Sequence, residues 1–377
     1  MNGRLLMEQT NSLLNKRLLK AIDCDTPDRI PIALRIDYAA AAWAKIPFSE
    51  FALQPLKASD VLEKAYDNIG SWDAVDASWT LGTRWSKIEA AKVEIPGIDF
   101  TGEIPHRIIE YPVMKSEDYD IILKEGINSL QKQMINRMGR KIDENIERNV
   151  FKSFAPIYKH WIIDRGVPVL RGGMVRPPFV QFSMWRTWRG IAQDLLSRKD
   201  KVKEASDAAW KDLVKKGENE SKIVGCNYVF IPCGRASATF LSEKLFLEYF
   251  FPYLKMIVEE LVKNGFTPRL HCDADWMPFL EYFLELPKKS CIIELGPETN
   301  LKQAKEILGG HICLYGNVPR KLLLAGSPVK VKEYCRKLIR DVGHDGFILA
   351  NDDIVPHNAK FENVKMLVDT GKKFGKK

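Results

Sequence analysis

The amino-acid sequence predicts a single α/β domain with the (β/α)8 TIM-barrel fold. Eight short apolar runs of strand length recur along the 377 residues, and each is followed by a stretch with helical spacing. Several runs are continuously apolar, which is typical of parallel strands covered on both faces. No Gly-x-Gly-x-x-Gly turn follows the first run, and eight strand–helix units favour a closed barrel over an open, doubly wound sheet.

The expected strands are, in chain order, residues 30–36, 74–78, 167–171, 227–232, 268–271, 291–295, 312–315 and 346–350. Between them, apolar residues such as Phe246, Phe250 and Leu254 recur every three or four positions, as on one face of a helix. Ser327 followed by Pro328 predicts a helix start, because Ser caps free N–H groups and Pro lacks one. Gly309 is expected to end the helix before the seventh strand.

The longest segment outside this pattern lies between the second and third expected strands, at about residues 80–165. It contains a turn-rich section over residues 93–112, which could form an added hairpin, and a charged helix around residues 128–145. No Pro/Ser/Gly-rich linker and no internal repeat sets it apart. We therefore expect one domain over residues 1–377, with this segment as an insertion over the barrel mouth.

Composition argues against several classes of function. The chain has 57 Lys and Arg against 49 Asp and Glu, and this net charge of +8 argues against nucleic-acid binding, although it could steer an anionic ligand or an acidic partner. Seven cysteines without C-x-x-C spacing indicate a reducing compartment. No apolar run reaches membrane-spanning length, and Glu8, Asn11 and Lys16 interrupt the apolar start of the chain, so we expect a cytoplasmic protein without a signal peptide.

Residues that can carry chemistry gather where the fifth expected strand ends, in the sequence LHCDADW at residues 270–276. In a (β/α)8 barrel the reacting groups lie at the C-terminal ends of the strands. His271 and Asp273 are therefore expected at the barrel mouth. Asp275 has a simpler interpretation as the cap of the helix that follows.

Several short motifs occur in a fixed order along the chain. DRIPI at residues 28–32 leads into the first strand, GIAQDLLSRKDKV at 190–202 follows the third, and LEYFFPYL at 247–254 precedes the fifth. Further motifs are LGG at 308–310, GNVP at 316–319, LLLAGSP at 322–328 and the closing stretch at 346–364. Together they resemble the uroporphyrinogen decarboxylase superfamily, which includes cobalamin-dependent (corrinoid) methyltransferases. The resemblance covers most of the chain and is weak between about residues 80 and 165.

The loop after the first strand distinguishes two branches of this superfamily. Uroporphyrinogen decarboxylases carry an Arg-rich loop there that holds substrate carboxylates, because bidentate guanidinium pairing makes such recognition strong. The matching residues 34–43 (LRIDYAAAAW) provide only Arg35, with Asp37 and a run of alanines. This argues against decarboxylation of that porphyrinogen and favours the methyltransferase branch.

The methyltransferase branch typically binds zinc through a His and a Cys after strand five and a second Cys after strand eight. By this resemblance His271 is a ligand, and Asp273 and Asp353 stand where the two Cys would be. A His with two carboxylates can hold zinc or another divalent metal, which would act as a Lewis acid if one position stays open. Cys272 remains an alternative to Asp273, and Asp352 an alternative to Asp353.

The resemblance implies a methyltransferase, and hard ligands favour an oxygen leaving group. We expect demethylation of a small methylated substrate, best a methoxylated aromatic compound, with His271, Asp273 and Asp353 as the catalytic residues. The methyl group would pass to the Co(I) corrinoid of a separate protein, since the chain shows no cobalamin domain. A metal-free decarboxylase or lyase that uses Asp and His as acid and base remains open, as does a scaffold without activity. The oligomeric state is open as well, a homodimer included.

Other side chains near the strand ends are expected to contact substrate. An Arg there could bind a carboxylate, and a Trp could line an apolar pocket. These residues are Arg35, Asp37, Arg176, Arg235, Trp276, Tyr315 and Asn317.

Overall fold

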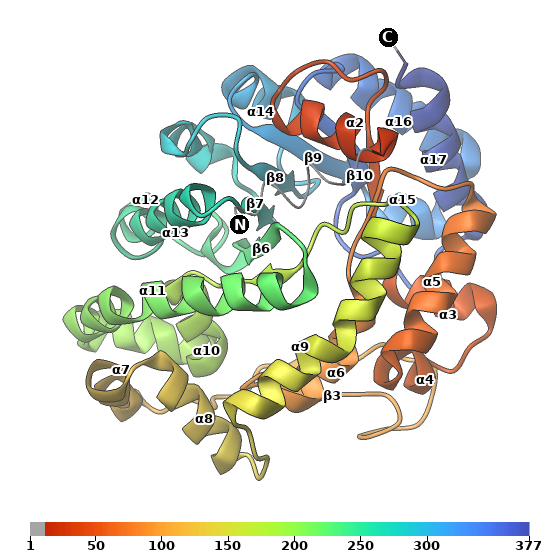
Figure 1. The fold of residues 1–377 in the computed structure, drawn as a ribbon. Coiled ribbons are helices and arrows are strands. Elements are labelled where there is room, and N and C mark those ends of the chain that lie inside the picture. The colour runs from red at the N-terminus through yellow and green to blue at the C-terminus, as the bar shows by residue number, and fades with distance from the viewer. Residues whose placement is uncertain (1–11, 377) are drawn as a thin grey trace.

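The computed structural model describes residues 12–376 and shows a ring of helices around a barrel of parallel strands (Figure 1). The order of the hydrogen-bonded strands is β2-β1-β10-β9-β8-β7-β6-β5. Their bounds are β1 (Ile32–Leu34), β2 (Ala74–Val75), β5 (Gly173–Met174), β6 (Tyr228–Pro232), β7 (Thr267–Cys272), β8 (Ile292–Leu295), β9 (Cys313–Val318) and β10 (Phe347–Asn351). Residues 1–11, on which the signal-peptide prediction depends in part, lie outside the described residues.

The barrel closes between β2 and the third expected strand. Val75 forms a parallel bridge with Val169, and Leu170 N donates to Val75 O at 2.9 Å. The chain then continues into β5, which pairs with β6. All eight expected strands therefore contribute to one ring, and the predicted (β/α)8 fold is confirmed.

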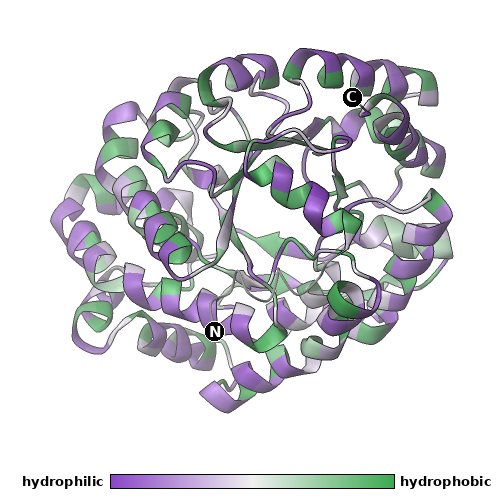
Figure 2. Cartoon of the chain, turned by 45° about the horizontal axis from the view of Figure 1, so that its top comes forward, coloured by the Kyte–Doolittle hydropathy of each residue, from purple (hydrophilic) through white to green (hydrophobic). Residues whose placement is uncertain are grey.

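The ring of helices places its apolar residues toward the strands and its polar residues outside (Figure 2). Ser327 caps α16 by accepting from Lys330 N, as its position before Pro328 predicts. The helices are α2 (Leu13–Ile22), α3 (Asp37–Ala44), α4 (Phe48–Leu53), α5 (Pro55–Ile69), α6 (Leu81–Lys87), α7 (Tyr119–Glu125), α8 (Ile127–Arg137), α9 (Glu144–Lys159), α10 (Pro178–Ser197), α11 (Lys199–Val224), α12 (Glu243–Leu245), α13 (Phe251–Lys263), α14 (Leu301–Leu308), α15 (Arg320–Ala325), α16 (Pro328–Val342) and α17 (Phe361–Phe374).

The third expected strand is interrupted rather than continuous. Its bridge at Val169 and strand β5 are separated by a short stretch that contains Gly172. A Cβ on Gly173 would lie 2.0 Å from Gly217 O of α11. Glycine is therefore needed here so that α11 can approach the sheet closely.

The segment between β2 and Val169 contains the predicted hairpin, formed by β3 (Lys92–Glu94) and β4 (Arg107–Ile109), which pair antiparallel. The prediction of a single charged helix around residues 128–145 is wrong, because two helices, α8 and α9, occupy this region. Gly139 adopts a φ of +76° between them, and the Asp143 side chain caps α9 by accepting from Ile146 N at 2.8 Å. Gly and Asp in these roles end one helix and begin another.

The barrel interior is more polar than such interiors usually are. Val, Ile and Leu dominate the inward positions of most (β/α)8 barrels. Here Arg269 of β7 and Glu294 of β8 are buried in the interior, at 0% and 1% exposure. Within the described residues, no helix has the length and apolar character needed to span a membrane.

Candidate active site

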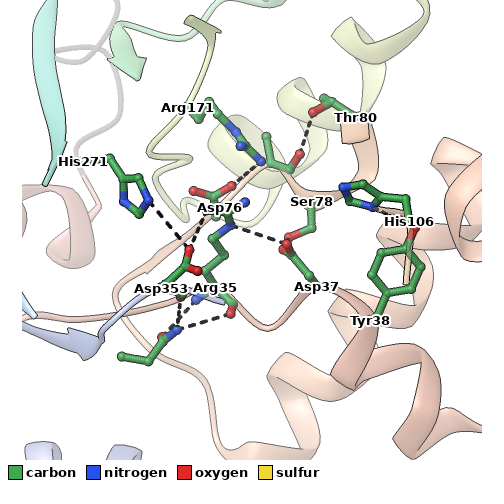
Figure 3. Close-up of polar contacts among 12 residues, drawn as sticks. Arg35, Asp37, Tyr38, Asp76, Ser78, Thr80, His106, Arg171, His271 and Asp353 are labelled. Carbon is green, nitrogen blue, oxygen red and sulfur yellow. Dashed lines mark hydrogen bonds and ion pairs between the residues drawn. The ribbon is translucent and has the colours of Figure 1, made fainter. Parts of the chain in front are cut away.

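His271 lies in a cluster with several carboxylates at the C-terminal ends of the strands, and Figure 3 shows its ion pair with Asp353. Its Nε2 lies 3.0 Å from Asp273 Oδ2 and 3.8 Å from Asp353 Oδ1. Its Nδ1 lies 3.1 Å from Glu294 Oε2, and its ring centroid is 5.2 Å from that of Phe230. Three carboxylates thus surround one buried imidazole.

The surrounding charges favour the protonated form of His271. Burial alone would lower its pKa, but the charges of Glu294 and then Asp273 outweigh burial and raise the pKa of His271 well above its ordinary value. Burial alone would also raise the pKa of Glu294, yet the charges of Arg269 and His271 lower it. The site therefore holds a cation and its anions in direct contact.

Asp353, in the loop after β10, is bound by two arginines. Its Oδ1 lies 3.3 Å from Arg35 Nη1, and its Oδ2 accepts from Arg320 Nη1 at 2.8 Å. Asn351 fixes the base of this loop, since its Oδ1 accepts from Arg35 N at 3.2 Å. The side chains of Arg320 and Asp273 are 45% and 41% exposed, so a ligand can reach the cluster from their side.

Cys272 and Asp275, the other candidates at the end of β7, do not join this cluster. Cys272 follows His271 on β7 and therefore faces the opposite side of the sheet, where it is fully buried beside Cys233. Asp275 Oδ1 accepts from Met277 N at 2.9 Å, which is the capping role that the sequence indicates. The structure brings together His271 and Asp273, and not Cys272.

The side chain of Asp352, the alternative to Asp353, binds a backbone N–H group. Its Oδ1 accepts from Arg320 N at 3.1 Å, where α15 begins. Burial raises the pKa of Asp352 to about 6, although Arg320 acts in the opposite direction. Asp353 is the residue whose carboxylate approaches His271.

A second polar layer lies next to His271 in the barrel interior, and sequence reasoning missed it. Arg269 Nη1 donates to Asp76 Oδ2 at 2.6 Å, while its Nε and Nη2 donate to Glu294 Oε2 at 3.1 and 2.8 Å. Arg171 Nη2 lies 2.5 Å from Asp76 Oδ1. The available signal was a charged residue within a strand covered on both faces, because a buried charge requires a partner.

Arg35 and Asp37, both expected at the mouth, meet there. Arg35 Nε lies 3.4 Å from Asp37 Oδ2, and Ser78 Oγ donates to Asp37 Oδ1 (Figure 3). Burial raises the pKa of Asp37, although the charge of Arg35 opposes that shift. Both side chains are committed to partners within the protein.

The insertion reaches the mouth through its hairpin. His106 Nδ1 lies 3.1 Å from Tyr38 Oη, next to β1, and Arg235 Nη2, after β6, donates to Glu110 Oε2 at 2.6 Å. The segment between His106 and Glu110 therefore bridges the loops after β1 and β6. Arg235, expected to contact substrate, instead holds the hairpin and stacks 4.5 Å from the Trp188 ring centroid.

His106 is another mouth residue that sequence reasoning missed, because nothing in the insertion linked it to the barrel. Burial and the charges of Arg35 and Arg171 lower its pKa to about 4. His106 is therefore neutral near pH 7 and adds no positive charge beside Tyr38.

Comparison with known proteins identifies the family. The family profile described as uroporphyrinogen decarboxylase (URO-D) matches residues 169–374, more than half of the chain. The chain belongs to the URO-D family. This confirms the superfamily resemblance that the ordered motifs indicate.

Two similar proteins illustrate how far the likeness extends. The uroporphyrinogen decarboxylase of Chlorobium luteolum is 32% identical over 108 residues, which are 28% of this chain and 30% of that protein. The match thus spans less than a third of that relative. A methyltransferase from Methanosarcina mazei has a TM-score of 0.73 at 17% identity, over 96% of this chain and 98% of that chain. At this identity the structural likeness shows a shared fold.

Two residues expected to contact substrate in this URO-D protein are instead buried and bound to partners within the protein. Trp276 is fully buried among aromatic rings, and its Nε1 donates to Asp273 O at 2.6 Å. Arg176 Nη1 donates to Glu89 Oε2 at 2.9 Å inside a separate buried network. Trp276 was misplaced because its spacing does not reveal which side of the loop it faces.

Tyr315 and Asn317 of β9 stabilise the barrel, Tyr315 from the interior and Asn317 on the side of Tyr334 of α16. The Tyr315 ring centroid lies 4.8 Å from the guanidinium carbon of Arg269. Asn317 Nδ2 donates to Gly296 O at 3.1 Å, which ties β9 to the loop after β8. Both residues are buried, at 1% and 3% exposure.

The predicted metal site requires three donors that are free to bind a cation. His271, Asp273 and Asp353 lie together, but both oxygens of Asp353 face guanidinium groups of Arg35 and Arg320. Across residues 12–376, no group of three or more His, Cys, Asp or Glu is arranged to hold a metal ion. In this arrangement the residues do not fit the metal, and zinc or another divalent ion stays a prediction.

Proposed function

We propose that this URO-D protein is a methyltransferase. It would take a methyl group from a small methylated substrate, best a methoxylated aromatic compound, and pass it to the Co(I) corrinoid of a separate protein. The family membership and the shared fold with a methyltransferase support the class of enzyme. The observation that carries the proposal is the cationic side of the mouth, where His271, Arg35 and Arg320 converge on Asp353.

In this proposal the leaving oxygen of the substrate binds beside these cations. A Co(I) corrinoid, when bound, supplies the nucleophile that accepts the methyl group. The bond between methyl carbon and ether oxygen breaks, and its electron pair stays on the oxygen as a phenolate. His271 Nε2 and the half-exposed guanidinium group of Arg320 can stabilise that developing charge, because fixed cations in a partly dry site need little reorganisation.

Asp273 and Asp353 would orient the cations. Asp273 lies 3.0 Å from His271 Nε2, and Asp353 holds Arg35 and Arg320 at 3.3 and 2.8 Å. A substrate held in line with the incoming nucleophile gains further from alignment. Each of the three residues that the sequence predicts as catalytic thereby has a role that needs no metal ion.

The predicted zinc or other divalent metal can be tested separately. Metal content would be measured in the purified chain and in His271→Ala. About one ion per chain, lost in the variant, would support a metal at this site and would require Asp353 to leave its arginines. The methyltransferase proposal itself does not depend on that result.

A metal-free decarboxylase or lyase remains the second candidate, because the family and the matched relative are described as uroporphyrinogen decarboxylase. The interior arginines argue against a substrate with many carboxylates. Arg35, Arg171 and Arg269 already have carboxylate partners at 3.3, 2.5 and 2.6 Å. Such a substrate would have to displace these partners.

The test is an assay with free cob(I)alamin and a panel of methoxylated aromatic acids and phenols. Consumption of Co(I) together with release of the demethylated phenol would support the proposal. His271→Gln is the inactive control, and Leu196→Gln is the matched surface control, since Leu196 is 88% exposed. No transfer from any methyl donor, with carbon dioxide released from a carboxylated substrate instead, would contradict the proposal and favour the lyase.

A further inference from the structure

Arg269 is exceptional for its place in the fold. It lies within β7, two residues before His271, and is fully buried. Its guanidinium carbon lies 5.4 Å from the Phe230 ring centroid and 4.8 Å from that of Tyr315. A guanidinium group in such surroundings is costly unless carboxylates pair with it.

Arg269 and His271 share one carboxylate oxygen. Glu294 Oε2 accepts from Arg269 Nε and Nη2 at 3.1 and 2.8 Å, and the same oxygen lies 3.1 Å from His271 Nδ1. Glu294 Oε1 has no hydrogen-bond partner among the described residues. The orientation of the Glu294 carboxylate therefore depends on the two-pronged contact with Arg269.

The same arginine also anchors the opposite side of the barrel. Arg269 Nη1 donates to Asp76 Oδ2 at 2.6 Å, and Asp76 follows β2, across the interior from β7. Asp76 is 4% exposed and Glu294 is 1% exposed. With both ends of its guanidinium group fixed, Arg269 has little freedom to turn.

We infer that Arg269 is a positioning residue for the reaction at His271. It fixes Glu294, and Glu294 holds the imidazole ring so that Nε2 faces Asp273 and the barrel mouth. The ring is thereby confined between a carboxylate on each nitrogen, with Phe230 against its face. Partners that orient a metal-binding histidine through its second ring nitrogen typically affect affinity or activity about 10- to 100-fold, and we expect an effect of this size here.

The test compares Arg269→Lys with Arg17→Lys. Lysine keeps the charge but lacks the planar fork, so it cannot make both contacts to Glu294 and the contact to Asp76. Arg17 is the matched control, because it is 5% exposed and bridges the two carboxylates Asp28 and Asp73 at the other end of the barrel. Glu294→Gln is a second variant that keeps the shape of the side chain.

Two readouts separate positioning from general destabilisation. The first is the ¹⁵N NMR signal of the His271 ring in the full chain labelled at its six histidines, assigned by its absence in His271→Gln. The second is the rate of methyl transfer to cob(I)alamin, and this readout alone rests on the proposed function. We expect Arg269→Lys and Glu294→Gln to shift the ring signals and to lower kcat about 10- to 100-fold, with KM changed less than kcat.

The control should leave both readouts unchanged while the protein remains folded. Unshifted His271 signals in a folded Arg269→Lys, or an equal loss of kcat in Arg17→Lys, would overturn the inference. If the wild-type chain transfers no methyl group, the proposed function fails, but the NMR comparison still decides whether Arg269 positions His271.

Discussion

Two arginine–carboxylate clusters, buried except for Asp28 and the partly buried Arg29 and Asp353, lie at opposite ends of the same barrel. The lower cluster, at the start of the strands, consists of Arg17, Asp28, Arg29 and Asp73. The mouth cluster, in the interior and at the strand ends, consists of Arg35, Asp37, Asp76, Arg171, Arg269, His271, Glu294 and Asp353. Both are built from Arg and Asp, and the mouth cluster adds His271 and Glu294.

The two clusters differ in how completely their polar atoms are satisfied. In the lower cluster Asp73 accepts from Arg17, from Arg29 and from Ile32 N, and Arg17 makes two hydrogen bonds to Asp28 at 2.8 and 2.6 Å. The mouth cluster contains buried atoms without a hydrogen-bond partner among the described residues. Within the same part of the chain, Arg171 Nε and Glu294 Oε1 have no ion-pair contact either, whereas each of the others faces an oppositely charged group at 2.5 to 3.4 Å. These others are Arg35 Nε, Asp37 Oδ2, Asp76 Oδ1, Arg171 Nη2 and His271 Nδ1.

The difference assigns separate tasks to the two ends of the barrel. Native proteins leave few buried polar atoms unsatisfied, and those that remain often lie at functional sites. In (β/α)8 barrels the lower face stabilises the fold and the mouth carries the chemistry. We therefore infer that the lower cluster stabilises the fold and that the mouth cluster has polar groups available to bind a ligand.

The largest expected effect is the loss of activity in His271→Gln. Removal of the cation that is proposed to stabilise the leaving oxygen should lower kcat/KM about 10²- to 10⁴-fold per folded molecule, and loss of its buried pair with Glu294 should also lower the free energy of unfolding. His311→Gln is the matched control, because His311 contacts Leu286 O at 2.9 Å, next to the start of β9 and away from the mouth. Equal activity of the two variants in the methyl-transfer assay would contradict the assignment of His271.

The lower cluster should show the opposite pattern. Asp73→Asn removes the charge that Arg17 and Arg29 share, and breaking a buried ion pair typically costs about 3–5 kcal/mol. Urea unfolding would measure this loss, while the activity per folded molecule should stay at the wild-type level. Asp25→Asn is the exposed control, and its surface pair with Lys289 should contribute less than about 1 kcal/mol.

Asp353→Asn should have an intermediate effect on activity. The amide keeps the size of the side chain but no longer attracts Arg35 and Arg320, so kcat should fall about 10- to 100-fold. Asp352→Asn is the neighbouring control and should reduce kcat less, because Asp352 mainly accepts from the Arg320 backbone. A greater loss in the Asp352 variant would reverse the two assignments.

The smallest expected effect is on the pH dependence of stability, through His106 in the insertion. The folded chain keeps His106 neutral down to about pH 4, whereas an unfolded chain binds a proton near the ordinary histidine pKa of 6.5. The contribution of His106 to stability is therefore present above pH 6.5 and is lost as the pH falls toward 4. The midpoint temperature of thermal unfolding should fall more steeply between pH 7 and pH 4 in the wild-type chain than in His106→Gln. Parallel curves would show that His106 titrates freely.

The sequence predicted the strands well because their signal is local. Apolar runs such as residues 291–295 and 346–350 are stable only as buried strands. The observed β8 begins one residue later than expected, and β10 is shifted by one residue along the chain. The helix around residues 128–145 was wrong because the break at Gly139 depends on a turn that charge patterning does not reveal. His271 and Asp273 were both expected at the end of the same strand, and the structure brings them together.

The partners of the site could not be predicted in the same way. Glu294 meets Arg269 and His271 only after β7 and β8 pair in register, with His271 opposite Glu294. His106 approaches Tyr38 through an insertion whose path the sequence does not specify. Contacts between residues this far apart in sequence follow from the closed sheet, and no local pattern encodes them.

The most direct test of the account is a single comparison of methyl transfer. Wild type, His271→Gln and Asp73→Asn would be shown to be folded and then incubated with cob(I)alamin and a methoxylated aromatic substrate. The account predicts transfer by the wild type and by folded Asp73→Asn, and a rate lower by about 10²- to 10⁴-fold in His271→Gln. Equal rates in His271→Gln and wild type, or a rate in folded Asp73→Asn as low as that in His271→Gln, would contradict the division of tasks between the two ends of the barrel.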